Sequence, residues 1–176
     1  MKKIFPLFLI AALAIFFASC KKDNNNNGGG GDYYVKAKFD GQLKEFSSSP
    51  ATVVKSKLAE GMYAMIIGGV STNEQFNIAL WSDKDDFQAG KTFALEAPEV
   101  SSYNTLAYVS PIGSAAPENM WTSIYQYGVV TETLSVTITE ATSSYIKGTF
   151  SGIIYQNNES TPNSKQITEG VFSAKF

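Results

Sequence analysis

Apolar and polar residues alternate with a period of two over most of the chain from residue 33 onward. In one clear case, Leu134, Val136 and Ile138 alternate with serine and threonine. A strand produces this pattern because successive side chains point to opposite faces of a sheet. Turn residues interrupt the alternation repeatedly, and after residue 19 no helical period extends over any length. The sequence therefore predicts an all-β fold, an antiparallel β-sandwich or a partly open β-barrel of about eight to ten strands.

The alternation also places the individual strands. The dipeptide Asp40-Gly41 lies between two alternating runs, which predicts a β-hairpin. In segment 75–82, Phe76, Ile78 and Leu80 share one side and are expected to face the core. The strands expected along the chain are 33–39, 43–46, 52–57, 62–69, 75–82, 92–96, 105–110, 121–126, 134–139, 146–154 and 172–176.

One short helical turn is expected near 83–89. Ser82 is a residue type that caps helices, the acids within 83–86 suit the positive end of a helix, and Gly90 suits its stop. The same acids form the densest carboxylate cluster of the chain, and Ca²⁺ prefers six to eight oxygen ligands. Phe87 stands where a further ligand would be needed. Helix capping therefore explains these acids, and no metal site is predicted.

Residues 1–19 have the composition of an export signal. Lys2 and Lys3 form a basic start, and an apolar block of 14 residues, 4–17, precedes small residues. A helix needs about 20 apolar residues to cross a bilayer, so this block is too short for a membrane span. We expect a signal peptide that is removed from the mature protein.

The segment Phe17-Ala18-Ser19-Cys20 resembles the lipobox of bacterial lipoproteins, although Phe17 stands where leucine is usual. The resemblance implies that Cys20 becomes the first mature residue and carries palmitate or similar acyl chains, and such chains hold a protein firmly on a membrane. A secreted protein with a stray cysteine is the alternative. Residues 20–31 contain four asparagines and four glycines and are expected to be a flexible linker, which leaves 32–176 as a single β domain.

Three segments near the end of the chain, Val136–Thr139, Gly148–Gly152 and Ile167–Phe172, resemble the ending of small Bacteroidota outer-membrane lipoproteins that are classed as a domain of unknown function. The resemblance implies an all-β domain anchored to the outer membrane of the cell envelope. It leaves open whether the domain faces the periplasm or the cell surface. It implies no catalytic residue and no cofactor.

The composition excludes several kinds of chemistry. All 14 basic residues are lysine, there is no histidine, and the one cysteine is assigned to lipid. The chain therefore lacks a histidine general base and the usual histidine or cysteine ligands of zinc and haem. Removal of the signal takes Lys2 and Lys3 away, so the net charge falls from −2 to −4. An acidic domain is not attracted to phosphate backbones, and we expect no nucleic-acid partner.

Aromatic and acidic residues supply the remaining candidate sites. Tyr103 and Trp121 lie beside predicted loops and are candidates for stacking on a glycan, although sheet and core packing explain aromatics as well. A glycosidase needs two carboxylates about 5 to 10 Å apart. The acids considered for such a pair are Glu74, Glu96, Glu99 and Glu118. Ordinary solvation of the protein surface explains these scattered acids better than a catalytic pair does. We therefore expect no enzyme.

The leading expectation is a lipid-anchored, non-enzymatic binding or accessory module whose partner is a glycan or an envelope protein, with its oligomeric state left open. The alternative is a lipocalin-like carrier that holds an apolar ligand in a barrel. The binding module and the carrier differ in whether the space inside the β domain is filled or hollow. A carrier needs a cavity, whereas a filled interior would be built by Phe39, Phe76, Leu80, Ile138, Phe150 and Phe172.

The alternation of Phe172, Ala174 and Phe176 is also similar to the closing strand of an outer-membrane barrel. Such a protein would not need a lipid anchor. The faces that would contact lipid also carry many Ser, Thr, Gly and Lys residues. The lipid-anchored module therefore remains the leading expectation.

Overall fold

The computed structural model describes residues 32–97, 100, 102–124, 134–156 and 163–176. These residues form thirteen strands, of which four have only two or three residues, so the predicted all-β fold is confirmed. The strands are β1 Tyr34–Phe39, β2 Gln42–Phe46, β3 Thr52–Ala59, β4 Met62–Val70, β5 Gln75–Ser82, β6 Thr92–Ala94, β7 Glu96–Ala97, β8 Ser102–Tyr103, β9 Thr105–Val109, β10 Met120–Thr122, β11 Ser135–Ala141, β12 Tyr145–Gln156 and β13 Ser164–Lys175.

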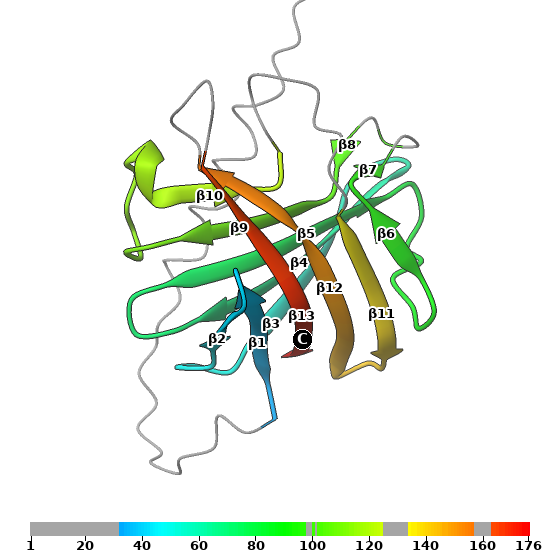
Figure 1. The fold of residues 1–176 in the computed structure, drawn as a ribbon. Coiled ribbons are helices and arrows are strands. Elements are labelled where there is room, and N and C mark those ends of the chain that lie inside the picture. The colour runs from blue at the N-terminus through cyan, green and yellow to red at the C-terminus, as the bar shows by residue number, and fades with distance from the viewer. Residues whose placement is uncertain (1–31, 98–99, 101, 125–133, 157–162) are drawn as a thin grey trace, which may run out of the picture.

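The strands form two layers that cross each other (Figure 1). The front layer has the order β2-β1-β13-β12-β11-β6, and the back layer has the order β3-β4-β5-β9-β10. The layers join at two corners: β10 pairs with β12, and β3 meets β13 through one parallel pair, Thr52 with Lys175. The fold is therefore a sandwich with joined corners, which makes it a partly open barrel. The short strands β7 and β8 pair separately.

The β1–β2 hairpin is confirmed, and its turn explains why the sequence identified it. Asp40 and Gly41 have φ angles of 49° and 83°. A two-residue turn that needs positive φ at both positions favours Asp-Gly, and its twist matches the twist of the flanking strands. Phe39 therefore pairs with Gln42, and the register continues to Val35 opposite Phe46.

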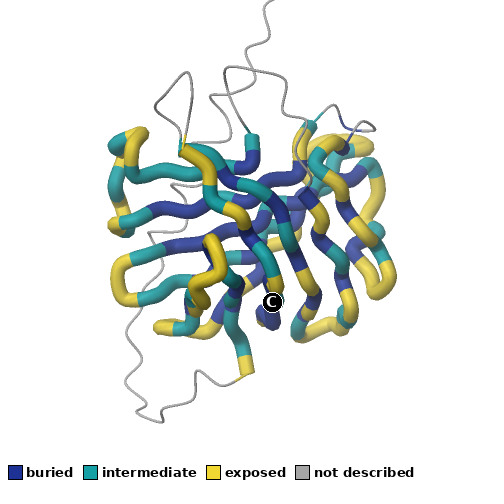
Figure 2. Tube along the Cα trace, in the orientation of Figure 1, coloured by how far each residue is buried: buried dark blue, intermediate teal, exposed yellow. Residues whose placement is uncertain are grey.

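Side chains fill the space between the layers. Phe46 stacks on Phe76 at 5.5 Å between ring centroids, and Phe76 stacks on Phe150 at 5.3 Å. Buried residues lie along the central strands, while exposed residues gather at the turns (Figure 2). The six residues that would build a filled interior all belong to one buried cluster: Phe39, Phe76, Leu80, Ile138, Phe150 and Phe172.

Two glycines allow phenylalanine rings to lie flat against the front layer. In the β12–β13 register Gly148 pairs with Phe172, and Phe150 pairs with Gly170. A Cβ atom at Gly148 would lie 2.4 Å from Phe172 Cζ, and one at Gly170 would lie 2.6 Å from Phe150 Cδ2. Each ring therefore covers the glycine opposite it, an arrangement that shields the bare backbone of a strand glycine.

The expected helical turn near 83–89 is wrong. Residues 83–85 form bends, and a short helix is found instead at Pro117–Asn119, as a single 3-10 turn. Phe87 is buried and stacks on Phe93, so this contact holds the segment to the core without a helix. Ser82 Oγ accepts a long hydrogen bond from Lys84 N at 3.4 Å and donates one to Asp86 Oδ1 at 2.7 Å, so its contacts stabilise the bend.

The strand bounds also differ from the predicted ones in the second half of the chain. β13 begins at Ser164, well before the predicted 172–176, and β10 ends at Thr122. The predicted strand 92–96 is divided into β6 and β7, and β8 was not predicted. Residues 125 and 126 of the predicted strand 121–126 lie outside the described residues.

Candidate functional site

Cys20 and the rest of segment 1–31 lie outside the described residues, so lipidation remains a prediction. The described chain starts at Asp32, whose carbonyl accepts a hydrogen bond from Ser173 Oγ at 2.6 Å. At the same end of the front layer, Phe176 N donates to the carbonyl of Ser144 in the β11–β12 turn. We name the end formed by Asp32, Ser144 and Phe176 the tether end (Figure 1). Within the described ranges, no helix has the length and hydropathy of a membrane span.

The two glycan candidates lie in different sheets. Tyr103 lies in β8 opposite Glu96, and 47% of its surface is exposed. Trp121 lies in β10 opposite Gln156, packs partly on the core, and has Lys165 Nζ 4.3 Å from its ring centroid. The structure therefore does not join the two rings into one platform. Tyr103 is the more accessible ring, whereas the Trp121 ring already contacts a cation.

The acids that were considered for metal or catalysis are paired with lysine or lie apart. Asp85 contacts Lys55 at 3.0 Å, and Asp86 forms an ion pair with Lys91. Among the described residues, no group of three or more acidic side chains is placed to hold a metal ion. Glu96 lies in β7 and Glu118 in the 3-10 turn, while Glu99 is outside the described residues.

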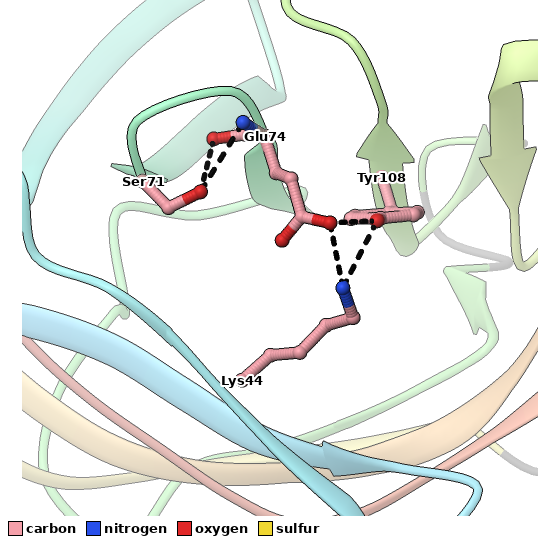
Figure 3. A network of polar contacts seen from close by, with 4 residues as sticks. All are labelled: Lys44, Ser71, Glu74 and Tyr108. Carbon is pink, nitrogen blue, oxygen red and sulfur yellow. Dashed lines mark hydrogen bonds and ion pairs between the residues drawn. The ribbon is translucent and has the colours of Figure 1, made fainter.

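A polar network that the sequence did not indicate closes one edge of the core (Figure 3). Lys44 Nζ lies 2.6 Å from Glu74 Oε1, and Tyr108 Oη donates to the same oxygen at 2.6 Å. Lys44 Nζ also donates to Tyr108 Oη at 3.3 Å. Ser71 Oγ accepts from Glu74 N and fixes the loop that carries Glu74. The network therefore joins β2, the β4–β5 turn and β9.

The network is stable in one protonation state at neutral pH. Burial lowers the pKa of Lys44, but hydrogen bonds with Glu74 and Tyr108 outweigh burial and leave that pKa raised. Burial raises the pKa of Glu74, but the same partners outweigh it and leave the pKa lowered. Burial and the bond to Glu74 raise the pKa of Tyr108. A general acid or base needs a pKa near neutral pH, and none of these three pKa values is shifted in that direction. The network therefore supports a structural role.

A groove of about 680 Å³ lies on the outer surface of the front layer. It is centred on a β-bulge in β13, where Glu169 has a φ of 50° and Gly170 follows. A β-bulge changes the direction in which the side chains of its strand point. Here Glu169 Oε1 lies 2.7 Å from Lys38 Nζ. We name this surface the bulge groove; it is lined by Lys36, Lys38, Leu43, Ser135, Thr149, Phe150, Ser151, Glu169, Gly170 and Val171.

The bulge groove was missed by the sequence analysis, although one signal was present. Ile167 and Phe172 both face the core, yet they are five positions apart. Residues on one face of a regular strand are separated by an even number of positions. An odd interval between two buried residues therefore indicates a bulge, and Glu169-Gly170 supplies it.

Comparison of the chain with protein-family models, with curated proteins and with solved structures finds no match. The arguments for function therefore come from the sequence and from the geometry above.

Proposed function

We propose that the protein is a lipid-anchored, non-enzymatic binding or accessory module of a bacterial outer membrane. The observation that carries the proposal is the lipobox-like segment Phe17–Cys20, followed by the Asn/Gly-rich linker and one β domain. The linker would enter the domain at the tether end, where Asp32 precedes β1. The outer surface of the front layer would then stand to the side of the membrane, open to partners.

Two observations favour a binding role over catalysis. The chain has no histidine, and in the Lys44–Glu74–Tyr108 network the carboxylate of Glu74 already accepts hydrogen bonds from Lys44 and Tyr108, while the pKa values of Lys44 and Glu74 are shifted away from neutral pH. The bulge groove, by contrast, is an open surface with hydroxyl groups, cations and a carboxylate, which are groups that bind polar ligands without reacting with them.

The alternative, a carrier of an apolar ligand, finds less support. A carrier needs a cavity between its layers. Phe76 and Phe150 stack in the middle of that space, and Phe172 packs against Phe150 at 6.5 Å between ring centroids. A ligand would have to displace these rings, so the packing weighs against the carrier.

The anchoring half of the proposal is tested by the variant Cys20→Ser, expressed as the full chain in a Bacteroidota host. The wild-type chain is expected to incorporate radiolabelled palmitate and to sediment with membranes. Cys20→Ser is expected to lose both properties, because a serine hydroxyl is not the lipidated thiol. Ser19→Ala keeps a small residue before the cysteine and serves as the matched control. Unchanged labelling and sedimentation of Cys20→Ser would refute the anchor.

The glycan-binding half is tested with a glycan screen on the mature protein, followed by titration of the best ligand. Loss of the stacking contact between an aromatic side chain and a nucleic-acid base costs about 1–3 kcal/mol, and we apply the same range to a sugar ring. Tyr103→Ala is therefore expected to weaken binding at least about fivefold, with Trp121→Ala having a smaller effect because Lys165 contacts its ring. Equal affinity in the wild-type and Tyr103→Ala proteins would remove Tyr103 as the site.

A further inference from the structure

The bulge groove contains three hydroxyl groups that have no hydrogen-bond partner among the described residues. Ser135 and Ser151 lie opposite each other in the β11–β12 register, and Thr149 lies two positions from Ser151 along β12. All three residues line the groove. The nearby hydroxyl of Thr137, by contrast, shares a hydrogen bond of 2.9 Å with that of Thr92. The groove therefore offers three free hydroxyl groups, each able to donate and to accept.

The β-bulge makes room beside these hydroxyl groups. Strand β13 runs between β1 and β12 in the front layer (Figure 1). The β12–β13 pairing shifts between Phe150 and Gly152, so Ser151 is left without a register partner among the described residues of β13. Glu169, at the bulge, is paired with Lys38 of β1 instead. The row of outward side chains is interrupted here, and the hollow of about 680 Å³ falls within the usual range of small-molecule sites.

Lys36 gives the groove a positive charge that no acid in the described ranges neutralises. Its Nζ lies 4.5 Å from the centroid of the Tyr34 ring, a contact that leaves the ammonium charge in place. Glu45 lies opposite Lys36 in the β1–β2 register, but the Glu45 carboxylate accepts a hydrogen bond from Ser47 Oγ at 2.8 Å. Within the described part of the chain, Lys36 forms no ion pair with Glu45 or with another acid. Its ammonium is available to an anion.

The charge of the lining suits one carboxylate better than a phosphate. Lys36, Lys38 and Glu169 give the lining a net charge of +1, although the whole chain has a net charge of −2. A carboxylate brings a single negative charge, whereas a phosphate monoester brings about −1.5 to −2 at neutral pH and would be repelled more strongly by Glu169. The chain also lacks arginine, whose planar fork binds phosphate through two bonds.

Leu43 gives the groove an apolar margin. It lies in the edge strand β2, opposite Lys38 in the β1–β2 register, and 66% of its surface is exposed. The half-buried Val171 lines the groove from β13. A pyranose ring carries C–H groups on its faces and hydroxyl groups around its edge, so it contacts apolar and polar groups together. A sugar ring with a carboxylate therefore matches the three kinds of group that the groove offers.

We propose that the bulge groove binds an acidic carbohydrate, with the sugar carboxylate on Lys36 and the sugar hydroxyls on the three free hydroxyl groups. The inference rests on the proposed binding role and names a ligand class for it. It depends neither on the anchor nor on Tyr103, which lies in the separate β7–β8 sheet. The margin of the groove is open, since the Glu169 side chain is 67% exposed. The ligand is therefore a segment of a longer carbohydrate chain and not an enclosed molecule.

The test uses the chain from residue 20 onward with Cys20→Ser, so that binding is measured without lipid and independently of anchoring. The probe is a galacturonic acid trisaccharide, and its methyl ester is the matched probe that keeps the hydroxyls and loses the charge. NMR titration is expected to show saturable binding of the acid and about fivefold weaker binding of the ester, a change that corresponds to about 1 kcal/mol. Affinity for the acid should fall as salt is added, because solvent reaches the groove.

Two charge variants make predictions of opposite sign. Lys36→Gln is expected to weaken binding of the acid about fivefold and to leave binding of the ester unchanged. Lys147→Gln removes the same charge from the same outer surface outside the groove and is the matched control. Glu169→Gln is expected to strengthen binding of the acid, because it removes a carboxylate from the lining and releases Lys38 from its ion pair. Circular dichroism checks that each variant is folded.

Ser135→Tyr tests the groove without changing its charge. The new ring would occupy the hollow from an exposed strand position, where aromatic residues are tolerated, and should abolish binding of both probes. Thr92→Tyr, at an exposed position of β6 outside the groove, should leave binding unchanged. The proposal would be overturned by an acid probe that does not bind, by equal affinity for acid and ester, or by equal affinity for a glutamate peptide of the same charge. The proposed function fails separately, through unchanged palmitate labelling of the full chain with Cys20→Ser.

Discussion

Gly148→Ala is expected to lower the free energy of unfolding by about 3 kcal/mol or more, the upper range for adding an atom to a packed site. A Cβ at this position would lie 2.3 Å from the carbonyl oxygen of Thr137 and 2.4 Å from Phe172 Cζ. The carbonyl belongs to the β11–β12 ladder and the ring belongs to the core. Moving either one would therefore disturb strand pairing or core packing. Since small domains have a total stability of about 5–15 kcal/mol, the variant would be close to unfolding.

Urea unfolding, followed through the two tryptophans, measures this effect. Gly61→Ala is the matched control, because Gly61 has a φ of 65° and no atom within 4 Å of an added Cβ. Its cost is the left-handed backbone strain alone, about 1–2 kcal/mol. Equal losses in the two variants would mean that the close approach at Gly148 is relieved by movement of the strands.

Glu74→Gln is expected to cost about 2–3 kcal/mol at pH 7, because it leaves a partly buried ammonium without its anion. The Lys44 side chain is 29% exposed and that of Glu74 is 24% exposed, so solvent screens the pair only in part. Tyr108 also loses the acceptor that its hydroxyl bonds at 2.6 Å. The three residues join segments far apart in the chain, and the loss should loosen that edge of the core.

The network also predicts a pH dependence of stability. The pKa of Glu74 is lowered in the folded protein, so its contribution is present above the ordinary glutamate pKa of about 4.3 and is lost as pH falls through the folded value. The pKa of Lys44 is raised, so its contribution is present below the ordinary lysine pKa of about 10.4 and is lost as pH rises through the folded value. Glu74→Gln should therefore flatten the acid side of the profile.

Urea midpoints measured from pH 3 to pH 11 test both statements. The matched control is Glu169→Gln, which removes the exposed ion pair with Lys38, whose side chains are 39% and 67% exposed. Exposed pairs contribute about 0–1 kcal/mol, so this variant should follow the wild-type profile closely. The structural role of the network would be refuted if Glu74→Gln and Glu169→Gln behaved alike.

The local parts of the fold could be predicted because short segments specify them. Asp40-Gly41 determines its own turn through two positive φ angles, and the period of two in segment 75–82 placed Phe76, Ile78 and Leu80 in the core correctly. The confirmed features depend on residues within about ten positions of each other, where sequence pattern is informative.

The parts that could not be predicted depend on distant residues. Glu74 is 30 positions from Lys44 and 34 from Tyr108, so their network exists only once β2, the β4–β5 turn and β9 are assembled. The helical turn expected near 83–89 does not form, and Phe87 of this segment is instead buried against Phe93, which lies outside it.

The reciprocal pairing of glycine and phenylalanine in β12 and β13 has a consequence for strand assembly. A slide of two residues in one direction would oppose Phe150 to Phe172, and a slide of two in the other direction would oppose Gly148 to Gly170. The first misalignment crowds two rings into one space, and the second leaves bare backbone unshielded. The longest hairpin of the molecule thus has one favoured alignment, which discourages kinetic traps during folding.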